Sequence, residues 1–400
     1  MKLNRENLQA VLDEQAAKRA IPGMVGVVGC GGERHVFVAG HMSFEGTSPP
    51  MRRDAIFRIA SMTKPFTAVA ALMLVDEGKL RVDEPVDRLL PELAGLRVLR
   101  TLGSTPDDTV PMKRPITVED LLIFRLGWGV QFDPELPIQR LVSDLPGFGM
   151  PDPTSPLTPD AYMRRLSQVP LMAQPGEQWL YTVGSNILGV LVSRAAGKSL
   201  DVVFQERIFA PLGMGDTGFW VPREKISRVV TGYMRSEGKW EIFDTPDGRY
   251  ATPPAFPAGD SGLVSTADDF ATFADFLFTG CNREGRRLLS ESLRVAMKTN
   301  YLTSDQISGG AVILGPGWGW GYGVGVQVGE NPYGIPRGAY GWNGGFGTSW
   351  FNDPGSEMSV VLLTQRVFDS PDPPEVHKEF WRAACATLNG NNRDKARRTR

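Results

Sequence analysis

Residues 57–80 read FRIASMTKPFTAVAALMLVDEGKL, and this stretch decides how the rest of the chain must be arranged. From Ser61 onward it is apolar on nearly every side, which predicts a helix buried in the core. Pro65 is tolerated only in the first turn of a helix, so the helix must begin close to Ser61. Gly78 is the residue type best suited to end it. A helix buried on all sides needs other elements around it.

Two alternating apolar runs precede this helix. MVGVVGC at 24–30 and ERHVFVAGH at 33–41 flank Gly31-Gly32, which is typical of a β-hairpin. Towards the other end, GTSWFN and EMSVVLLTQ flank the turn Asp353-Pro354-Gly355, and residues 320–328 alternate, so at least three more strands are expected there. A final helix is predicted over residues 374–388.

Strands at both ends with helices between them predict an α/β (α+β) fold. One antiparallel sheet is built from both termini and flanked by helices, and a mostly helical domain is inserted. Residues 1–80 and 255–392 would form a discontinuous α/β domain, and 81–254 the helical, loop-rich domain. The basic tail RDKARRTR at 393–400 is predicted to be disordered.

The composition excludes several classes of partner. With 43 Lys and Arg against 45 Asp and Glu, the formal net charge is -2, so neither a nucleic acid nor an anionic membrane is expected to bind. No window approaches the ~20 apolar residues of a membrane span. The first 20 residues resemble an amphipathic helix rather than a secretory signal, which favours a cytoplasmic enzyme. Cys30, Cys281 and Cys385 are scattered singly, so we expect buried thiols rather than a disulfide framework or zinc site.

Catalytic groups can be sought by elimination. The three histidines, His35, His41 and His377, fall in the predicted hairpin and the terminal helix, where each is interpreted as structural. No HExxH or paired Cys/His spacing occurs, so no metal is expected. Residues 259–262, GDSG, spell the nucleophile motif of trypsin-like proteases. A capped helix follows almost at once and the preceding machinery is missing, so we interpret this segment as a tight loop.

Ser61-Met62-Thr63-Lys64 remains as the candidate. Residues i and i+3 share one face of a helix, so Lys64 can reach the Ser61 hydroxyl and take its proton. A lysine acts as a base only when burial or hydrogen bonding lowers its pKa from ~10.4 toward 7, and the apolar surroundings supply burial. Ser61 at the helix start would also offer its backbone N–H to an oxyanion. An exposed Ser/Lys pair is the alternative, because S-x-x-K arises by chance in many proteins.

At this point a family resemblance can be stated. FRIASMTKPFTAVAALMLVDEGKLRVDEPVDRLLPEL at 57–93 resembles the nucleophile segment of the serine β-lactamase-like superfamily: class C β-lactamases, penicillin-binding proteins and, closest, family VIII carboxylesterases. The similarity continues through ITVEDLLIFRLGWG, PGEQWLYTVGSNILGVLVSRAAGKSL, FAPLGMGDTGF and YGWNGGFGTSWFNDP. It implies the β-lactamase/penicillin-binding-protein fold and a serine hydrolase that needs neither cofactor nor metal.

The resemblance also implies roles for individual residues. Ser61 would be the acyl-accepting nucleophile and Lys64 its base. Tyr181 would relay protons between nucleophile, leaving group and water, with a core aromatic as the alternative reading. The backbone N–H groups of Ser61 and of Gly345, on an edge strand, would hold the oxyanion.

Departures from the family pattern bear on the substrate. The tyrosine motif is Tyr181-Thr182-Val183, which lacks the asparagine of β-lactamases, and Trp342 stands where their third motif has lysine. An indole cannot attract a carboxylate, and losing a charge-assisted contact of about 1.5–3 kcal/mol penalises anionic substrates. Arg125 is interpreted as a loop residue, with an anion contact as the alternative. The residues predicted to contact substrate are Trp342, Asn343, Gly344, Phe346 and Trp128.

These observations predict a ping-pong carboxylesterase acting on a small-molecule ester of short to medium chain length. The nearest alternatives use the same site as a β-lactamase, a D-aminopeptidase or a transacylase. A different class remains open, a penicillin-binding protein that is acylated once without turnover.

Overall fold

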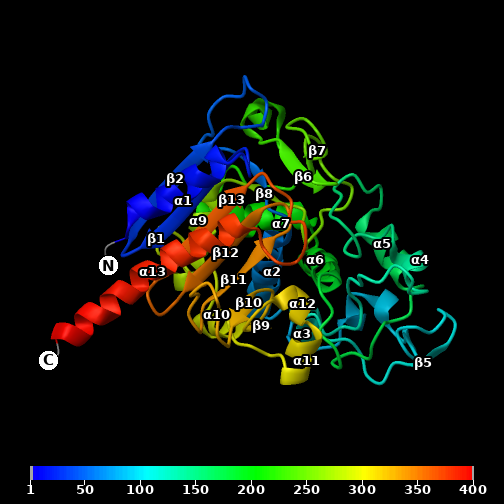
Figure 1. Ribbon diagram of the computed structural model, residues 1–400. Coiled ribbons are helices and arrows are strands. Elements are labelled where there is room, and N and C mark those ends of the chain that lie inside the picture. Colours follow the sequence, from blue (N-terminus) through cyan, green and yellow to red (C-terminus); the bar gives the residue numbers. More distant parts are fainter. Residues whose placement is uncertain (1–2, 399–400) are drawn as a thin grey trace.

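A seven-stranded antiparallel sheet forms the centre of the computed structural model, which describes residues 3–398, with side chains up to Ala386 (Figure 1). The strand order is β2-β1-β13-β12-β11-β10-β9. Its strands are β1 (Gly23–Cys30), β2 (Glu33–Gly40), β9 (Trp318–Trp320), β10 (Gly325–Gln327), β11 (Tyr340–Gly344), β12 (Thr348–Asp353) and β13 (Met358–Thr364). Both ends of the chain contribute to one sheet, as the sequence predicts.

The join between the two ends lies at β1 and β13. Val27 pairs with Val361 in their register, so the N-terminal hairpin extends the sheet begun by the C-terminal strands. The hairpin turn has φ of 60° at Gly31 and 80° at Gly32, and two positive φ values are what a tight two-residue turn requires. The predicted hairpin is confirmed.

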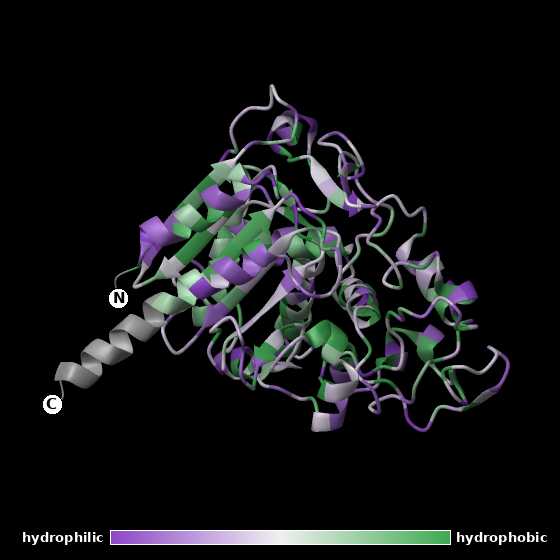
Figure 2. Cartoon of the chain, viewed as in Figure 1, coloured by the Kyte–Doolittle hydropathy of each residue, from purple (hydrophilic) through white to green (hydrophobic). Residues whose placement is uncertain are grey.

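Helices cover the two faces of this sheet. On one face α1 (Arg5–Ala17) and α13 (Glu375–Arg398) lie side by side (Figure 1). On the other face α2 (Lys64–Asp76) and α9 (Ala267–Thr279) form the larger core. Met24 and Val28 of β1 pack with α1 and α13, while Val25 and Val27 pack into the larger core, as the two-residue period of a strand requires. The hydropathy colouring follows this layering, with green strands beneath purple outer helix surfaces (Figure 2).

Shorter elements complete the fold. The remaining helices are α3 (Val118–Leu122), α4 (Gln139–Val142), α5 (Pro159–Leu166), α6 (Val183–Ala196), α7 (Leu200–Phe204), α8 (Ala210–Leu212), α10 (Glu291–Met297), α11 (Ser304–Gly309) and α12 (Ala311–Leu314). Short 3₁₀ turns are η1 (Ala60–Thr63), η2 (Val86–Arg88), η3 (Pro91–Leu93) and η5 (Arg223–Arg228), and η4 (Gln205–Phe209) is a π-helical turn. Small two-stranded pairs are β3 (Phe57–Arg58) with β8 (Val264–Ser265), β4 (Arg97–Leu99) with β5 (Thr109–Pro111), and β6 (Gly232–Ser236) with β7 (Lys239–Asp244).

Two details differ from the sequence prediction. Residues 320–328 are not one strand, because β9 and β10 are joined by a turn in which Gly323 has φ of 72°. A Cβ on Gly323 would lie 2.5 Å from the Cβ of Ala68, so a glycine is needed where this turn meets α2. The pairs β4–β5 and β6–β7 also add strands to a middle region expected to be helical. The two-domain division and the disordered tail at 393–400 stay predictions, and residues 399–400 lie outside the described part.

No helix within residues 3–398 has both the length and the apolar character needed to cross a membrane.

Candidate active site

The turn that carries Ser61 is held in an unusual backbone conformation. The chain passes from β3 through η1 into α2, so the predicted buried helix begins with a 3₁₀ turn. Ala60 has φ of 42°, a left-handed conformation that costs a non-glycine residue on the order of 1–3 kcal/mol. The neighbouring Ile59 fixes the turn on both sides, because its N–H donates to the Leu263 carbonyl at 3.0 Å and its carbonyl accepts from Thr348 Oγ1 at 3.1 Å.

Lys64 is aimed at the Ser61 hydroxyl. Its Nζ lies 2.9 Å from Ser61 Oγ and 3.0 Å from the backbone carbonyl oxygen of Asp260. It also lies 4.5 Å from the centre of the Tyr181 ring. The lysine is fully buried, as the apolar sequence around it predicts. A buried amine in contact with a serine hydroxyl is the arrangement that base activation of a nucleophile requires.

Tyr181 lies beside Lys64, two residues before the start of α6. Its Oη accepts a hydrogen bond from Trp342 Nε1 at 2.6 Å. An N–H donor aimed at this oxygen stabilises negative charge that develops there. The rings of Phe124, Trp179 and Trp320 pack around the tyrosine, with centroids 5.8, 5.7 and 6.1 Å away. Trp342 therefore binds the proposed proton relay as well as occupying the lysine position of the third motif.

Strained backbone conformations occur next to Ser61 and Tyr181. Six non-glycine residues of the described chain have positive φ, and three of them, Arg19, Glu237 and Glu357, are exposed. The other three are buried and lie beside the candidate residues: Ala60 precedes Ser61, Thr182 follows Tyr181 with φ of 87°, and Phe124 packs on the Tyr181 ring. Such strain persists only where the surroundings enforce it, and it is enriched at functional sites.

Gly345 lies in the turn that follows β11 rather than on an edge strand, which corrects the prediction. β11 is flanked by both β10 and β12, but β10 pairs only with Tyr340 and Gly341, so the end of β11 is open on that side. A Cβ on Gly344 would lie 2.1 Å from the Ile59 carbonyl oxygen, so a glycine is needed for β11 to approach the nucleophile turn. Within residues 3–398 no hydrogen-bond acceptor is found for the backbone N–H of Ser61 or of Gly345.

Ser61 and Gly345 open into one cavity of about 470 Å³. Most of the predicted site residues line it, namely Ser61, Tyr181, Trp342, Asn343, Gly345 and Phe346. Its described lining includes Asp260, whose carboxylate is bonded to two hydroxyls, and Asp369, whose carboxylate forms an ion pair with Arg366, but no lysine or arginine. The volume lies within the range of small-molecule sites.

Two of the predicted substrate contacts do not reach this cavity. Trp128 is fully buried, and its indole N–H donates to the Pro170 carbonyl at 2.9 Å, so it belongs to the core. Gly344 is buried against Ile59, in the turn that leads to Ser61. It allows β11 to pack closely on this turn and does not face the substrate cavity. The expectation that these residues bind substrate is therefore wrong in both cases.

Asp260 is a site residue that the sequence reasoning missed. Its carboxylate accepts hydrogen bonds from Thr182 Oγ1 at 2.9 Å and from Ser261 Oγ at 2.6 Å. Its backbone N–H donates to Asn186 Oδ1 at 3.1 Å, and its carbonyl contacts Lys64. The GDSG segment is thus a tight loop, as predicted, but one that positions the lysine. The GDSG motif is the sequence signal for this loop, but its pattern indicates a nucleophile and not a carbonyl that holds a lysine.

The histidines and Arg125 lie outside the chemistry. None of the three histidines lines the Ser61 cavity. Burial lowers the pKa of His377 to about 3, and its Nδ1 lies 2.8 Å from Ser349 Oγ. Arg125 forms an ion pair with Glu119 at 3.3 Å, which confirms its interpretation as a loop residue. Cys30 and Cys385 are buried thiols, as expected, whereas Cys281 is only half-buried.

Comparison with known proteins agrees with this geometry. The family model for Beta-lactamase matches residues 8–381. Esterase EstB of Burkholderia gladioli is 32% identical over 385 residues, which cover 92% of each chain. Protein Rv1367c of Mycobacterium tuberculosis is 37% identical over 330 residues, 80% of each chain. The solved structure of EstCE1, described as a hydrolase with promiscuous acyltransferase activity, matches with a TM-score of 0.80 at 26% identity, covering 95% of this chain and 98% of its own.

The chain therefore belongs to the Beta-lactamase family. Its esterase and acyltransferase relatives identify it with the serine hydrolases and acyltransferases of that family. The resemblance and fold class predicted from the sequence are confirmed.

Proposed function

We propose that the protein is a carboxylesterase that forms an acyl-enzyme on Ser61. One observation carries the proposal: Lys64 Nζ lies 2.9 Å from Ser61 Oγ, beside a cavity whose described lining contains no lysine or arginine. The first part supplies an activated nucleophile. The second disfavours substrates that carry a carboxylate, as penicillins and peptides do, and leaves neutral esters as the preferred class.

Acylation follows from the contacts around Ser61. Lys64 Nζ accepts the Ser61 hydroxyl proton while Oγ bonds to the ester carbonyl carbon. The carbonyl oxygen becomes an oxyanion, which accepts hydrogen bonds from the N–H groups of Ser61 and Gly345. Tyr181 gives its proton to the leaving alcohol oxygen as the carbon–oxygen bond breaks, and it is reprotonated from Lys64. The alcohol leaves and the acyl group stays on Ser61.

Deacylation repeats these steps with water. Tyr181 and Lys64 accept a proton from the water as its oxygen bonds to the acyl carbon, and the same two N–H groups hold the second oxyanion. The bond to Ser61 Oγ breaks, Oγ regains a proton, and the carboxylic acid leaves. Relatives carrying the names esterase and hydrolase support this reading.

Transfer of the acyl group to an alcohol is the second candidate. It requires only that an alcohol replace the water of deacylation. The acyltransferase activity in the description of EstCE1 favours it. Adding a primary alcohol to the ester assay distinguishes the two activities, because transfer yields a new ester whereas hydrolysis yields only the acid.

Turnover of p-nitrophenyl acetate, butyrate and octanoate by the wild type and Ser61→Ala tests the proposal. We expect steady turnover of a short ester and a loss of about a thousandfold or more in the variant. A chromogenic cephalosporin should be a much poorer substrate than the acetate. Equal rates for the two proteins would remove Ser61 as the nucleophile, and a single turnover without a steady state would favour the penicillin-binding reading.

A further inference from the structure

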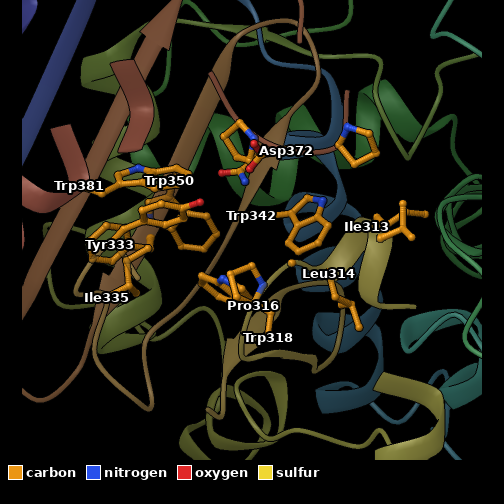
Figure 3. A pocket seen from close by; sticks show the side chains of 16 residues that line it. Ile313, Leu314, Pro316, Trp318, Tyr333, Ile335, Trp342, Trp350, Asp372 and Trp381 are labelled. Atoms are coloured by element: carbon orange, nitrogen blue, oxygen red, sulfur yellow. The ribbon is translucent and has the colours of Figure 1, made fainter. Parts of the chain in front are cut away.

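A second cavity of about 230 Å³ adjoins the one that contains Ser61 (Figure 3). The two share Ile313, Trp342, Asn343 and Pro371 as lining residues. Most of the remaining lining is aromatic or aliphatic and includes Leu314, Trp318, Tyr333, Ile335, Trp350 and Trp381. Figure 3 shows Trp342 on one side of this space and Tyr333, Trp350 and Trp381 on the other. Nothing in the chemistry derived above uses it.

The charge of this cavity points to a neutral occupant. Among the described residues that line it, Asp372 is the only ionisable acidic or basic group apart from the Tyr333 phenol, and its carboxylate forms an ion pair with Lys378 at 2.6 Å. Since that carboxylate is already paired, it offers little to an ionic ligand. An apolar cavity of ~150 Å³ is large enough to bind benzene, so about 230 Å³ accommodates one ring with a short linker.

The shared wall indicates which end of an ester would enter. Trp342, which belongs to both cavities, donates its indole N–H to Tyr181 Oη at 2.6 Å. Tyr181 is the residue that we propose protonates the leaving alcohol. Of the two cavities, Tyr181, Gly345 and Phe346 line only the one that contains Ser61, so the second cavity meets the tyrosine through the Trp342 indole. The second cavity therefore adjoins the leaving-group side of the reacting ester.

We propose that the second cavity binds the alcohol part of the substrate, and that this part is a neutral apolar group about the size of one ring. This inference rests on the proposed function. It separates the two ends of the substrate: the alcohol lies beyond Trp342, and the acyl group stays in the cavity beside Phe346.

Acid release at constant pH tests this assignment with two ester series. Methyl and benzyl butyrate vary the alcohol, whereas methyl butyrate and methyl hexanoate vary the acyl chain. Ile335→Trp fills the second cavity and should lower the benzyl-to-methyl ratio of kcat/KM by about 10-fold or more. The hexanoate-to-butyrate ratio should stay within about twofold. Ile242→Trp, at an exposed position of β7 that lines neither cavity, is the matched control and should move neither ratio.

A second variant covers the case in which the first does not fold. Trp318→Ala enlarges the same cavity and should raise the rate on a naphthylmethyl ester relative to the benzyl ester; thermal unfolding reports whether each variant is folded. If the wild type hydrolyses none of these esters, the proposed function fails and this inference with it. If it hydrolyses them and the alcohol ratios are unmoved, or the acyl ratio moves instead, only the assignment of the second cavity is overturned.

Discussion

The two walls of the Ser61 cavity differ in the kind of contact that builds them. Beneath Lys64, the carboxylate of Asp260 accepts two hydroxyl hydrogen bonds, and its backbone binds both Asn186 and the lysine. Around Trp342 the wall is aromatic, and the polar contact of this indole is the hydrogen bond from its Nε1 to Tyr181 Oη at 2.6 Å. A dense hydrogen-bond network fixes one arrangement, whereas packed rings define a shape. We infer that the polar wall sets the rate on every ester and the aromatic wall sets the choice among esters.

Replacing the base in the polar wall should have the largest effect. Lys64→Met keeps the length of the side chain but removes the amine 2.9 Å from Ser61 Oγ. General base catalysis contributes ~10²–10⁴-fold, so we expect a fall of about a thousandfold in kcat/KM for every ester tested. Lys298→Met is the control, because Lys298 also lies near a tyrosine ring, Tyr340, away from the cavity. A tenfold loss or less would contradict the role of Lys64.

Tyr181 joins the two walls, and Tyr181→Phe should have the next largest effect. The ring beneath which Lys64 lies is kept, while the oxygen bonded to Trp342 is lost. We expect kcat to fall about 100-fold for acetate and octanoate alike, because the proton relay acts in deacylation whatever the length of the acyl chain. Tyr322→Phe removes a phenol bonded to Glu119 outside the cavity and should leave kcat unchanged. A loss confined to one ester would instead assign Tyr181 to substrate selection.

Asp260→Asn should have a smaller effect that is uniform across esters. The amide weakens the acceptors of the Thr182 and Ser261 hydroxyls, while the backbone contact to Lys64 remains. We expect kcat to fall about tenfold with KM nearly unchanged, and the pH profile of kcat/KM to shift, as for a positioning residue. Asp269→Asn is the matched control, since Asp269 also accepts from a threonine hydroxyl at 2.9 Å but lies elsewhere. An unchanged pH profile with lower thermal stability would make Asp260 merely structural.

The aromatic wall should respond differently. Phe346→Ala removes a ring that lines the cavity and packs on Phe243 with centroids 4.7 Å apart. We expect the octanoate-to-acetate ratio of kcat/KM to rise severalfold, up to about 10-fold, because space is gained without loss of catalytic groups. Equal losses on both esters would break the distinction between the two walls.

A buried histidine away from both walls gives the smallest effect, on stability alone. The pKa of His377 is lowered from 6.5 to about 3 in the folded protein by burial. Between these values the unfolded chain binds a proton that the folded chain does not, so stability falls as pH drops through this window, by up to about 1.4 kcal/mol per pH unit. In denaturant titrations, the free energy of unfolding should fall less between pH 7 and pH 5 for His377→Gln than for the wild type. The exposed His41→Gln should retain the wild-type dependence.

Much of the fold could be predicted because local patterns determined it. The two-residue alternation and Gly31-Gly32 predicted the first hairpin, and the apolar run after Ser61 predicted α2. The i, i+3 spacing then brought Lys64 to Ser61. In contrast, the close approach of Gly323 to Ala68 joins segments more than 250 residues apart. No local pattern predicts that contact.

The site was predicted in part for the same reason. Ser61, Tyr181, Trp342 and Gly345 meet at one cavity, as their motifs implied. Trp128 was misassigned because an aromatic residue near a motif can face either the core or the substrate, and only the packing decides. Asp260 was missed because its role depends on Lys64, on Thr182 and Asn186, and on its neighbour Ser261, and no spacing in the sequence brings the two distant segments to this loop.

The central claim is that an acyl group is carried by Ser61. Rapid-quench mass spectrometry of the protein mixed with p-nitrophenyl butyrate measures this directly, with proteolytic mapping of any adduct. We predict one butyryl group on the peptide that contains Ser61, formed with the p-nitrophenol burst and absent from Ser61→Ala. An adduct on another peptide, or turnover with no adduct at any quench time, would contradict the account.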